Sequence, residues 1–359
     1  MRIKFLTMAG LLALAVAPPA QAQTAIAVPS DAAWKHAQTG LTLPATVIGI
    51  ARSSLADNGG KQLDVMAGYG DGQATVVTLY VFRPALASVP MWFDRSEAQI
   101  MLRDVYGSPT APAAAAAFAP PRGTATSALR RMYVPGKGPF KATGLAIMPL
   151  GDWLVAVRIS SQELDAPALD AKLDEVIKAL GWPEKVTEGQ PAVTIAPCAA
   201  PLAYSKKAKL KAPNMMDALL GATLSSMVAD EAEKGKDGKG GDGKDKMEVE
   251  KATPITWCRE GSPIQPYGTY RAVGLDTGYT IAIGDAGVVI DVDTGLAALI
   301  NKEPTYQLKL ELLDRTLVYP SFDKLPTPDA AIAAVKGNSP ISSVERGTKN
   351  VVISTGTVK

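Results

Sequence analysis

Hydrophobic and polar positions alternate between residues 63 and 83, where the clearest hairpin of the chain is predicted. The run LDVMAGY is followed by Gly70-Asp71-Gly72 and then by ATVVTLYVF, which ends at Pro84. Two apolar runs around a glycine-rich turn are typical of an antiparallel hairpin. Because both faces of the second run are apolar, we expect a central strand with a helix over one side.

Three more strands and a closing helix are predicted downstream of this hairpin. The strands are expected at 128–134, 140–149 and 153–160. Leucine, valine and isoleucine then recur at helical spacing from residue 164 to residue 180, before Gly181 and Pro183. Residues 31–188 are therefore predicted to form a sheet-rich N-terminal α+β domain.

Another helix is expected to begin at Asp94 or Ser96 and to end at Tyr106, before Gly107. Met91-Trp92-Phe93 falls in the loop predicted before this helix. Aromatic residues are mostly core residues, and the alternative is that this segment is an exposed apolar loop that contacts a partner.

The second half of the chain, residues 191–359, is predicted to be a β-rich α+β domain. Its expected strands lie at 269–275, 279–283, 288–292, 306–313, 316–319 and 351–354, and its expected helices at 214–233 and 328–336. Residues 233–251 are Gly, Lys and Asp with almost no apolar content, which predicts a disordered insertion. The fold class expected for the whole chain is therefore α+β, with two domains that each pack a few helices on a mainly antiparallel sheet.

The first 22 residues have the pattern of a secretory signal peptide. Arg2 and Lys4 precede an apolar run, and Ala20-Gln21-Ala22 forms a small-x-small cleavage site before Gln23. The apolar run is too short to cross a bilayer, which takes about 20 residues. We therefore expect cleavage after Ala22, a periplasmic or secreted location, and no transmembrane segment in the mature chain.

Cleavage and export affect how the net charge and the two cysteines are interpreted. Removing Arg2 and Lys4 leaves 35 basic and 35 acidic residues, so the mature chain is neutral and no nucleic-acid partner is expected. In an oxidising compartment, Cys198 and Cys258 are predicted to form a disulfide. In the chain-entropy view, closing a loop of this size stabilises the fold by about 4 kcal/mol.

The sequence contains a single histidine for histidine-dependent catalysis. Ser-His-Asp and Cys-His enzymes need a histidine beside the nucleophile. The single histidine, His36, lies before the first predicted strand and is expected on a surface helix. Ser321-Phe322-Asp323-Lys324 matches Ser-x-x-Lys, but it lacks the companion motifs and falls in a predicted loop.

Acidic residues offer two further candidates for chemistry. Asp276-Thr277-Gly278 and Asp293-Thr294-Gly295 resemble aspartic-protease triplets, but they lie too close together for a two-lobed protease and are interpreted as turns. Asp285, Asp291 and Asp293 lack the ligand spacing of a calcium loop. The sequence therefore assigns no catalytic, cofactor or metal residue, and its site prediction is limited to Cys198 and Cys258.

One stretch of the N-terminal half suggests a family. The segment from Gly151 to Arg158, followed by the amphipathic helix up to Gly181-Trp182, resembles the closing elements of PsbP/Mog1-like α/β domains. The resemblance covers residues 31–185 and transfers no functional residue. It implies a fold that hosts binding and assembly factors more often than enzymes.

These observations lead to a hypothesis and an alternative. The hypothesis is an exported, non-enzymatic binding or envelope-assembly protein, with no cofactor and with an unidentified protein or envelope component as its partner. The alternative is a carboxylate-dependent periplasmic hydrolase, because paired carboxylates of such enzymes meet only in the fold.

Overall fold

The structure is a computed structural model that describes residues 23–71, 74–187, 189–213, 255–294, 305–348 and 350–354. The predicted signal peptide, the helix expected at 214–233 and the insertion at 233–251 lie outside the described residues.

The expected α+β class is wrong, because the chain is mainly β. Of the described residues, 38% lie in strands and 14% in helices. The helices in this part of the chain are α1 (Val89–Leu102), α2 (Ala166–Ala179) and α5 (Pro328–Gly337). Strands that the hydrophobic pattern did not single out, such as Ile50–Asp57, account for part of the difference.

The first sheet comprises nine of the described strands and is antiparallel along its whole path. In spatial order they are β1 (Thr24–Ala25), β5 (Ile50–Asp57), β6 (Asp64–Tyr69), β7 (Thr75–Phe82), β11 (Trp153–Ser161), β10 (Ala142–Leu150), β9 (Ala128–Tyr133) and β8 (Ala116–Phe118), with β4 (Thr46–Val47) paired to β5. β2 (Trp34–Lys35) and β3 (Thr42–Leu43) form a separate two-stranded ribbon. The predicted 63–83 hairpin is β6 and β7.

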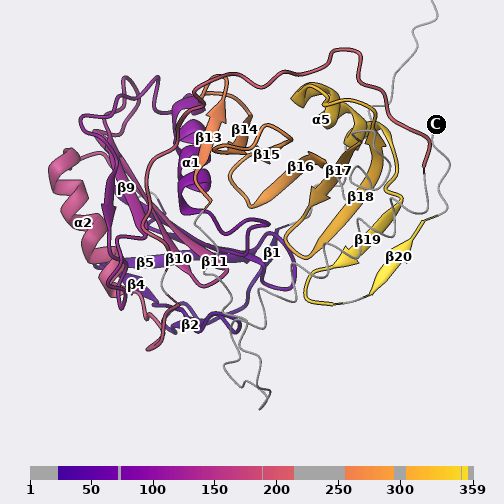
Figure 1. The fold of residues 1–359 in the computed structure, drawn as a ribbon. Coiled ribbons are helices and arrows are strands. Elements are labelled where there is room, and N and C mark those ends of the chain that lie inside the picture. Colours follow the sequence, from indigo (N-terminus) through magenta and orange to yellow (C-terminus); the bar gives the residue numbers. More distant parts are fainter. Residues whose placement is uncertain are drawn as a thin grey trace, which may run out of the picture.

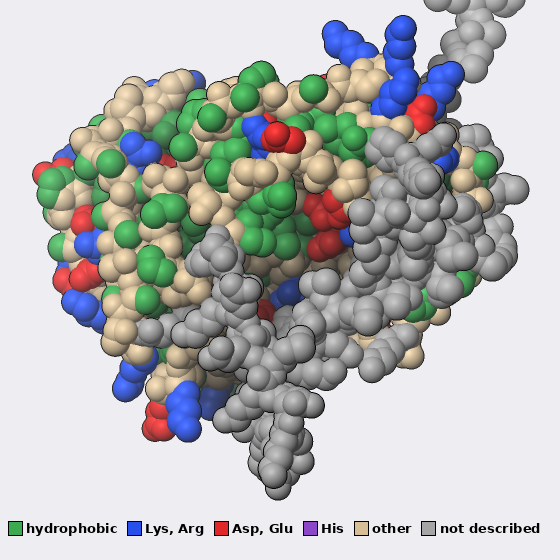
Figure 2. Space-filling model, in the orientation of Figure 1, with side chains coloured by type: hydrophobic (Ala, Val, Ile, Leu, Met, Phe, Trp, Pro, Cys, Tyr) green, Lys and Arg blue, Asp and Glu red, His purple; other side chains and the backbone are tan. Residues whose placement is uncertain are grey.

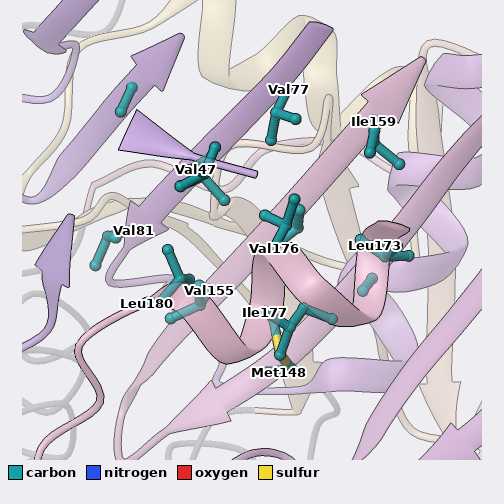
Figure 3. Packing of buried hydrophobic residues seen from close by; sticks show 14 of the residues in the cluster. Val47, Val77, Val81, Met148, Val155, Ile159, Leu173, Val176, Ile177 and Leu180 are labelled. Carbon is teal, nitrogen blue, oxygen red and sulfur yellow. The ribbon is translucent and has the colours of Figure 1, made fainter. Parts of the chain in front are cut away.

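Helix α2 covers one face of this sheet. Leu173, Val176 and Ile177 of the helix point toward β7, β10 and β11 (Figure 3) and are almost fully buried there. Asp165 caps the helix by accepting from the Ala168 N–H, and the helix ends before Gly181, as its spacing predicted. Burying a leucine or valine side chain stabilises a fold by about 1.5–3 kcal/mol, so this face holds the main core of the N-terminal half.

The second sheet also contains nine described strands, which follow one another in sequence order. They are β12 (Ala196–Pro197), β13 (Trp257–Glu260), β14 (Tyr267–Ala272), β15 (Tyr279–Ile283), β16 (Val288–Thr294), β17 (Tyr306–Glu311), β18 (Arg315–Phe322), β19 (Ser342–Glu345) and β20 (Val351–Ile353). Helix α5 packs on one face through Ala331 and Ala334 (Figure 1).

Helix α1 lies between the two sheets (Figure 1). It begins at Val89 because the Ser88 hydroxyl accepts from the Met91 N–H and Pro90 fits the first turn. Met91-Trp92-Phe93 is thus helical and at most 1% exposed, so the interpretation as an exposed loop is wrong and the core interpretation is confirmed. The same cluster contains Tyr270 of the second sheet, so this one of the apolar clusters is shared by both sheets.

Two adjacent charged residues of α1 reach the second sheet. Asp94 is paired with Arg259 and accepts a hydrogen bond of 2.6 Å from the Tyr270 hydroxyl. Arg95 is fully buried and donates to the backbone carbonyls of Gln265 and Gly284, at 2.8 and 3.1 Å. Burial raises the pKa of Asp94, which the Tyr270 hydrogen bond and the charge of Arg259 partly offset. These contacts fix the helix to the second half of the chain.

The predicted disulfide is confirmed. Cys198 and Cys258 are bonded, with their Cα atoms 4.8 Å apart, and they tie the short strand β12 to β13. Within the described residues, none of the helices has the length and apolar content that crossing a bilayer requires.

We expect Asp94→Ala to lower the free energy of unfolding by about 3–5 kcal/mol, because Arg259 would remain buried without its partner. Asp104→Ala, an exposed change just beyond α1, should have little effect. Urea unfolding of both variants checks this. Equal losses for the two variants would show that the pair does not hold α1 in place.

Candidate functional site

Two cavities lie at opposite ends of helix α1. The first, here called the apolar cavity, has a volume of about 360 Å³ and lies at the helix N-terminus. Its walls come from residues 86–90, from the ends of β9 and β10, from residues 189–195 and from the start of β13. None of the fifteen residues that line it is charged.

The rim of the apolar cavity exposes hydrophobic side chains. Val193 and Ile255 are 63% and 65% exposed, and Trp257 lies beside them, partly buried. Figure 2 shows hydrophobic side chains gathered on the face where the two halves meet. Few polar side chains, among them Ser127 and Gln190, line the cavity. The site is thus suited to contact apolar groups.

The second cavity, here called the polar cavity, has a volume of about 90 Å³. It lies between β6, β7, β11, the C-terminal half of α1 and the turn between β15 and β16. Its polar lining residues are Asp64, Tyr80, Ser96, Arg103, Arg158 and Asp285. Both sheets and α1 therefore contribute to one small ionic site.

Two of the charged residues that line the polar cavity form an ion pair with each other, and the other two have no such partner among the described residues. Arg158 forms an ion pair with Asp285 and lies over the Tyr80 ring, 5.7 Å from its centroid. Asp64 is 8% exposed, and its carboxylate accepts a long hydrogen bond of 3.4 Å from the Asn58 side-chain amide. Within the described residues, neither Asp64 nor the exposed Arg103 has an ion-pair partner.

Burial raises the pKa of Asp64 to about 6, and the negative charges of Asp285 and Asp57 add to the effect. At neutral pH this carboxylate is ionised but poorly compensated. A buried charge without a partner is unfavourable for folding, so Asp64 is a site residue that fold stability alone does not explain.

The hydrolase alternative requires two carboxylates that face the same cavity, and the polar cavity contains two. Asp64 and Asp285 line the same space, and their environments differ, because Arg158 neutralises Asp285 alone. The cavity is well below the roughly 300–1,000 Å³ of typical ligand pockets. This size disfavours a saccharide substrate, and the alternative stays a prediction.

The chain matches none of the family models, curated proteins or solved structures with which it was compared. The resemblance to PsbP/Mog1-like domains therefore stays a prediction.

His36 is not on a surface helix, as the sequence suggested, but fully buried after β2. Its Nε2–H donates to the Gln62 carbonyl at 2.9 Å, Nδ1 contacts Thr39, and its ring packs edge-on against Trp153. Burial lowers the pKa of His36, which keeps the ring neutral. It is a core residue with both nitrogens engaged.

The two Asp-Thr-Gly triplets are neighbours but form no catalytic pair. Asp276 lies in the β14–β15 connection, as predicted for a turn, and pairs with Arg271. Asp293 and Thr294 instead end strand β16, so the turn interpretation is wrong for these two residues, and Gly295 lies outside the described residues. Asp293 pairs with Lys309 at 3.1 Å. Each aspartate has its own cation. Similarly, Ser321 lies within strand β18 instead of in a loop, whereas Asp323 and Lys324 follow the strand.

The remaining calcium candidates are also engaged elsewhere. Asp291 accepts a hydrogen bond of 2.5 Å from Thr280, and Asp285 belongs to the polar cavity. Among the described residues, no group of three or more His, Cys, Asp or Glu side chains is arranged to hold a metal ion.

The sequence did not single out the residues of the polar cavity. One signal was present, because Arg158 is the charged residue of the otherwise uncharged strand WLVAVRISS, and Asp64 opens the apolar run DVMAGY. A charged side chain in a strand with two buried faces must find a polar environment.

We expect Asp64→Asn to stabilise the protein at pH 7.5 by up to about 3 kcal/mol, since a pKa raised from 3.8 to about 6 corresponds to that energy. Between these two values the folded state binds more protons than the unfolded state, so the wild type loses stability as pH rises. The gain should therefore vanish near pH 4.

Urea unfolding at pH 4.0 and pH 7.5 measures the difference between variant and wild type. Contributions common to both proteins, such as that of His36, cancel in this difference. Asp104→Asn serves as the exposed control. A gain that is the same at both pH values would rule out titration of Asp64 as its cause.

Proposed function

We propose that this protein is exported and binds an uncharged, predominantly apolar small molecule in the apolar cavity. One observation carries the proposal, namely a cavity of about 360 Å³ without a charged lining residue, at the junction of the two sheets. Ligand sites in proteins are typically concave, mostly apolar and located between structural units.

The chemistry of the lining restricts the ligand. A charged ligand group at depth would lose its hydration without gaining a partner, which is strongly unfavourable. Apolar ligand surface would instead be removed from water against Leu86, Ile195 and Trp257, at about 25 cal/mol per Å². Gln190 and Ser127 offer hydrogen bonds for one polar group, such as a hydroxyl or a carbonyl.

The exposed rim supports the same assignment. Val193 and Ile255 are large apolar side chains with more than half of their surface exposed to water. A bound ligand would cover them, and that burial adds to the affinity.

We expect the uncharged fluorescent probe N-phenyl-1-naphthylamine to bind saturably to the wild-type protein. Ala87→Trp should weaken this binding at least tenfold, because the indole would occupy the cavity that Ala87 lines. Titration followed by probe fluorescence measures the affinity.

Ala114→Trp is the matched control, because Ala114 is exposed and lies outside the cavity. Its affinity should equal that of the wild type. If both tryptophan variants bind the probe like the wild type, the apolar cavity is not the binding site.

Export is supported by the N-terminal pattern and by the disulfide. We expect the full chain, expressed in a bacterium with two membranes, to be recovered from the periplasm with Gln23 as its first residue. Leu12→Arg should interrupt the apolar run and leave uncleaved precursor in the cells. N-terminal sequencing decides the outcome, and periplasmic protein that retains Met1 would contradict cleavage.

A further inference from the structure

Two charged groups of the polar cavity, the Asp64 carboxylate and the Arg103 guanidinium, have no ion-pair partner in the described part of the chain. Arg158 and Asp285 form an ion pair between the two halves of the chain. Asp64 remains as a buried negative charge, and Arg103 lies at the exposed end of α1 as a positive charge. Tyr80 lines the space together with them, and within the described residues its hydroxyl has no hydrogen-bond partner.

We propose that the polar cavity is a second binding site, which takes the zwitterion of a small α-amino acid such as glycine or alanine. The proposal does not depend on the function proposed for the apolar cavity, because the two cavities share no lining residue.

Each end of such a ligand would meet a complementary group. An ammonium group would donate to Asp64, which otherwise keeps its charge without a cation. The ligand carboxylate would accept from Arg103, whose planar guanidinium donates in pairs to carboxylates. The Tyr80 and Ser96 hydroxyls line the same space and offer further hydrogen bonds.

The size of the cavity restricts the side chain of the ligand. About 90 Å³ is several times the roughly 10–15 Å³ that one water molecule needs, but it is far below a drug-sized pocket. Phe82, Ala156 and Ala286 form the apolar part of the wall. We therefore expect room for a hydrogen atom or a methyl group as the side chain, and rejection of leucine.

Isothermal titration calorimetry of the mature protein at pH 7.5 tests the proposal with five probes. Glycine and alanine should bind with the same stoichiometry of one. Methylamine, acetate and leucine should bind at least tenfold more weakly, because each lacks one charge or is too large. If methylamine binds as well as glycine, the site is a cation site and the zwitterion proposal is wrong.

Variants locate the binding. Asp64→Asn and Arg103→Gln should each weaken glycine binding at least tenfold, whereas Arg103→Lys, which keeps the charge, should retain part of it. The exposed changes Asp104→Asn and Lys207→Gln are the matched controls and should bind like the wild type. Circular dichroism establishes that each variant is folded.

The pH dependence gives a separate readout. Glycine binding should weaken as pH falls below about 6, since protonation of Asp64 removes the charge that holds the ammonium group. Absence of binding at millimolar glycine and alanine, or unchanged binding in Asp64→Asn, would overturn the proposal. Neither result would affect the test with the apolar probe.

Discussion

The pairing of Asp94 and Arg95 with the second sheet is the interaction on which the rest of this structure depends. Helix α1 is covered on both sides, so Asp94 and Arg95 are buried and find their partners in the other half of the chain. Arg259, Tyr270 and two backbone carbonyls supply them. Because these contacts are directional, they fix how α1 lies between the sheets, which apolar packing alone would leave less defined.

The position of α1 also explains why the two cavities differ. A helix of 14 residues is about 21 Å long, so its two ends lie in different surroundings. Proline, alanine and isoleucine side chains from residues 86–90, 189–195 and 255–257 surround the N-terminus of the helix, and the space between them is apolar. At its C-terminal half, the turn after β15 brings Asp285 over Arg158, which leaves an ionic space. One element thus separates two sites of opposite chemistry.

Sequence reasoning found the elements whose signals are local. The β6–β7 hairpin, helix α2 and the Cys198–Cys258 bond follow from alternation, helical spacing and compartment. Sequence reasoning failed where the contact that determines the structure joins residues far apart in the sequence. Asp94 and Arg259 are 165 positions apart, so nothing near Met91-Trp92-Phe93 indicated that a second sheet would bury it. The same applies to Asp285, which meets Arg158 across 127 positions.

In the polar cavity an arginine lies near two carboxylates but forms an ion pair with only one of them. Arg158 lines the same space as Asp64, yet it is paired with Asp285 and stacked over Tyr80. An asparagine at position 64 could accept the Asn58 hydrogen bond without carrying a buried charge. Since ionised Asp64 weakens folding at neutral pH, its charge has no structural use in the described part of the chain. An ionisable group that is buried in a cavity without a charge partner is a candidate for a binding site, because a bound ligand can supply the missing partner.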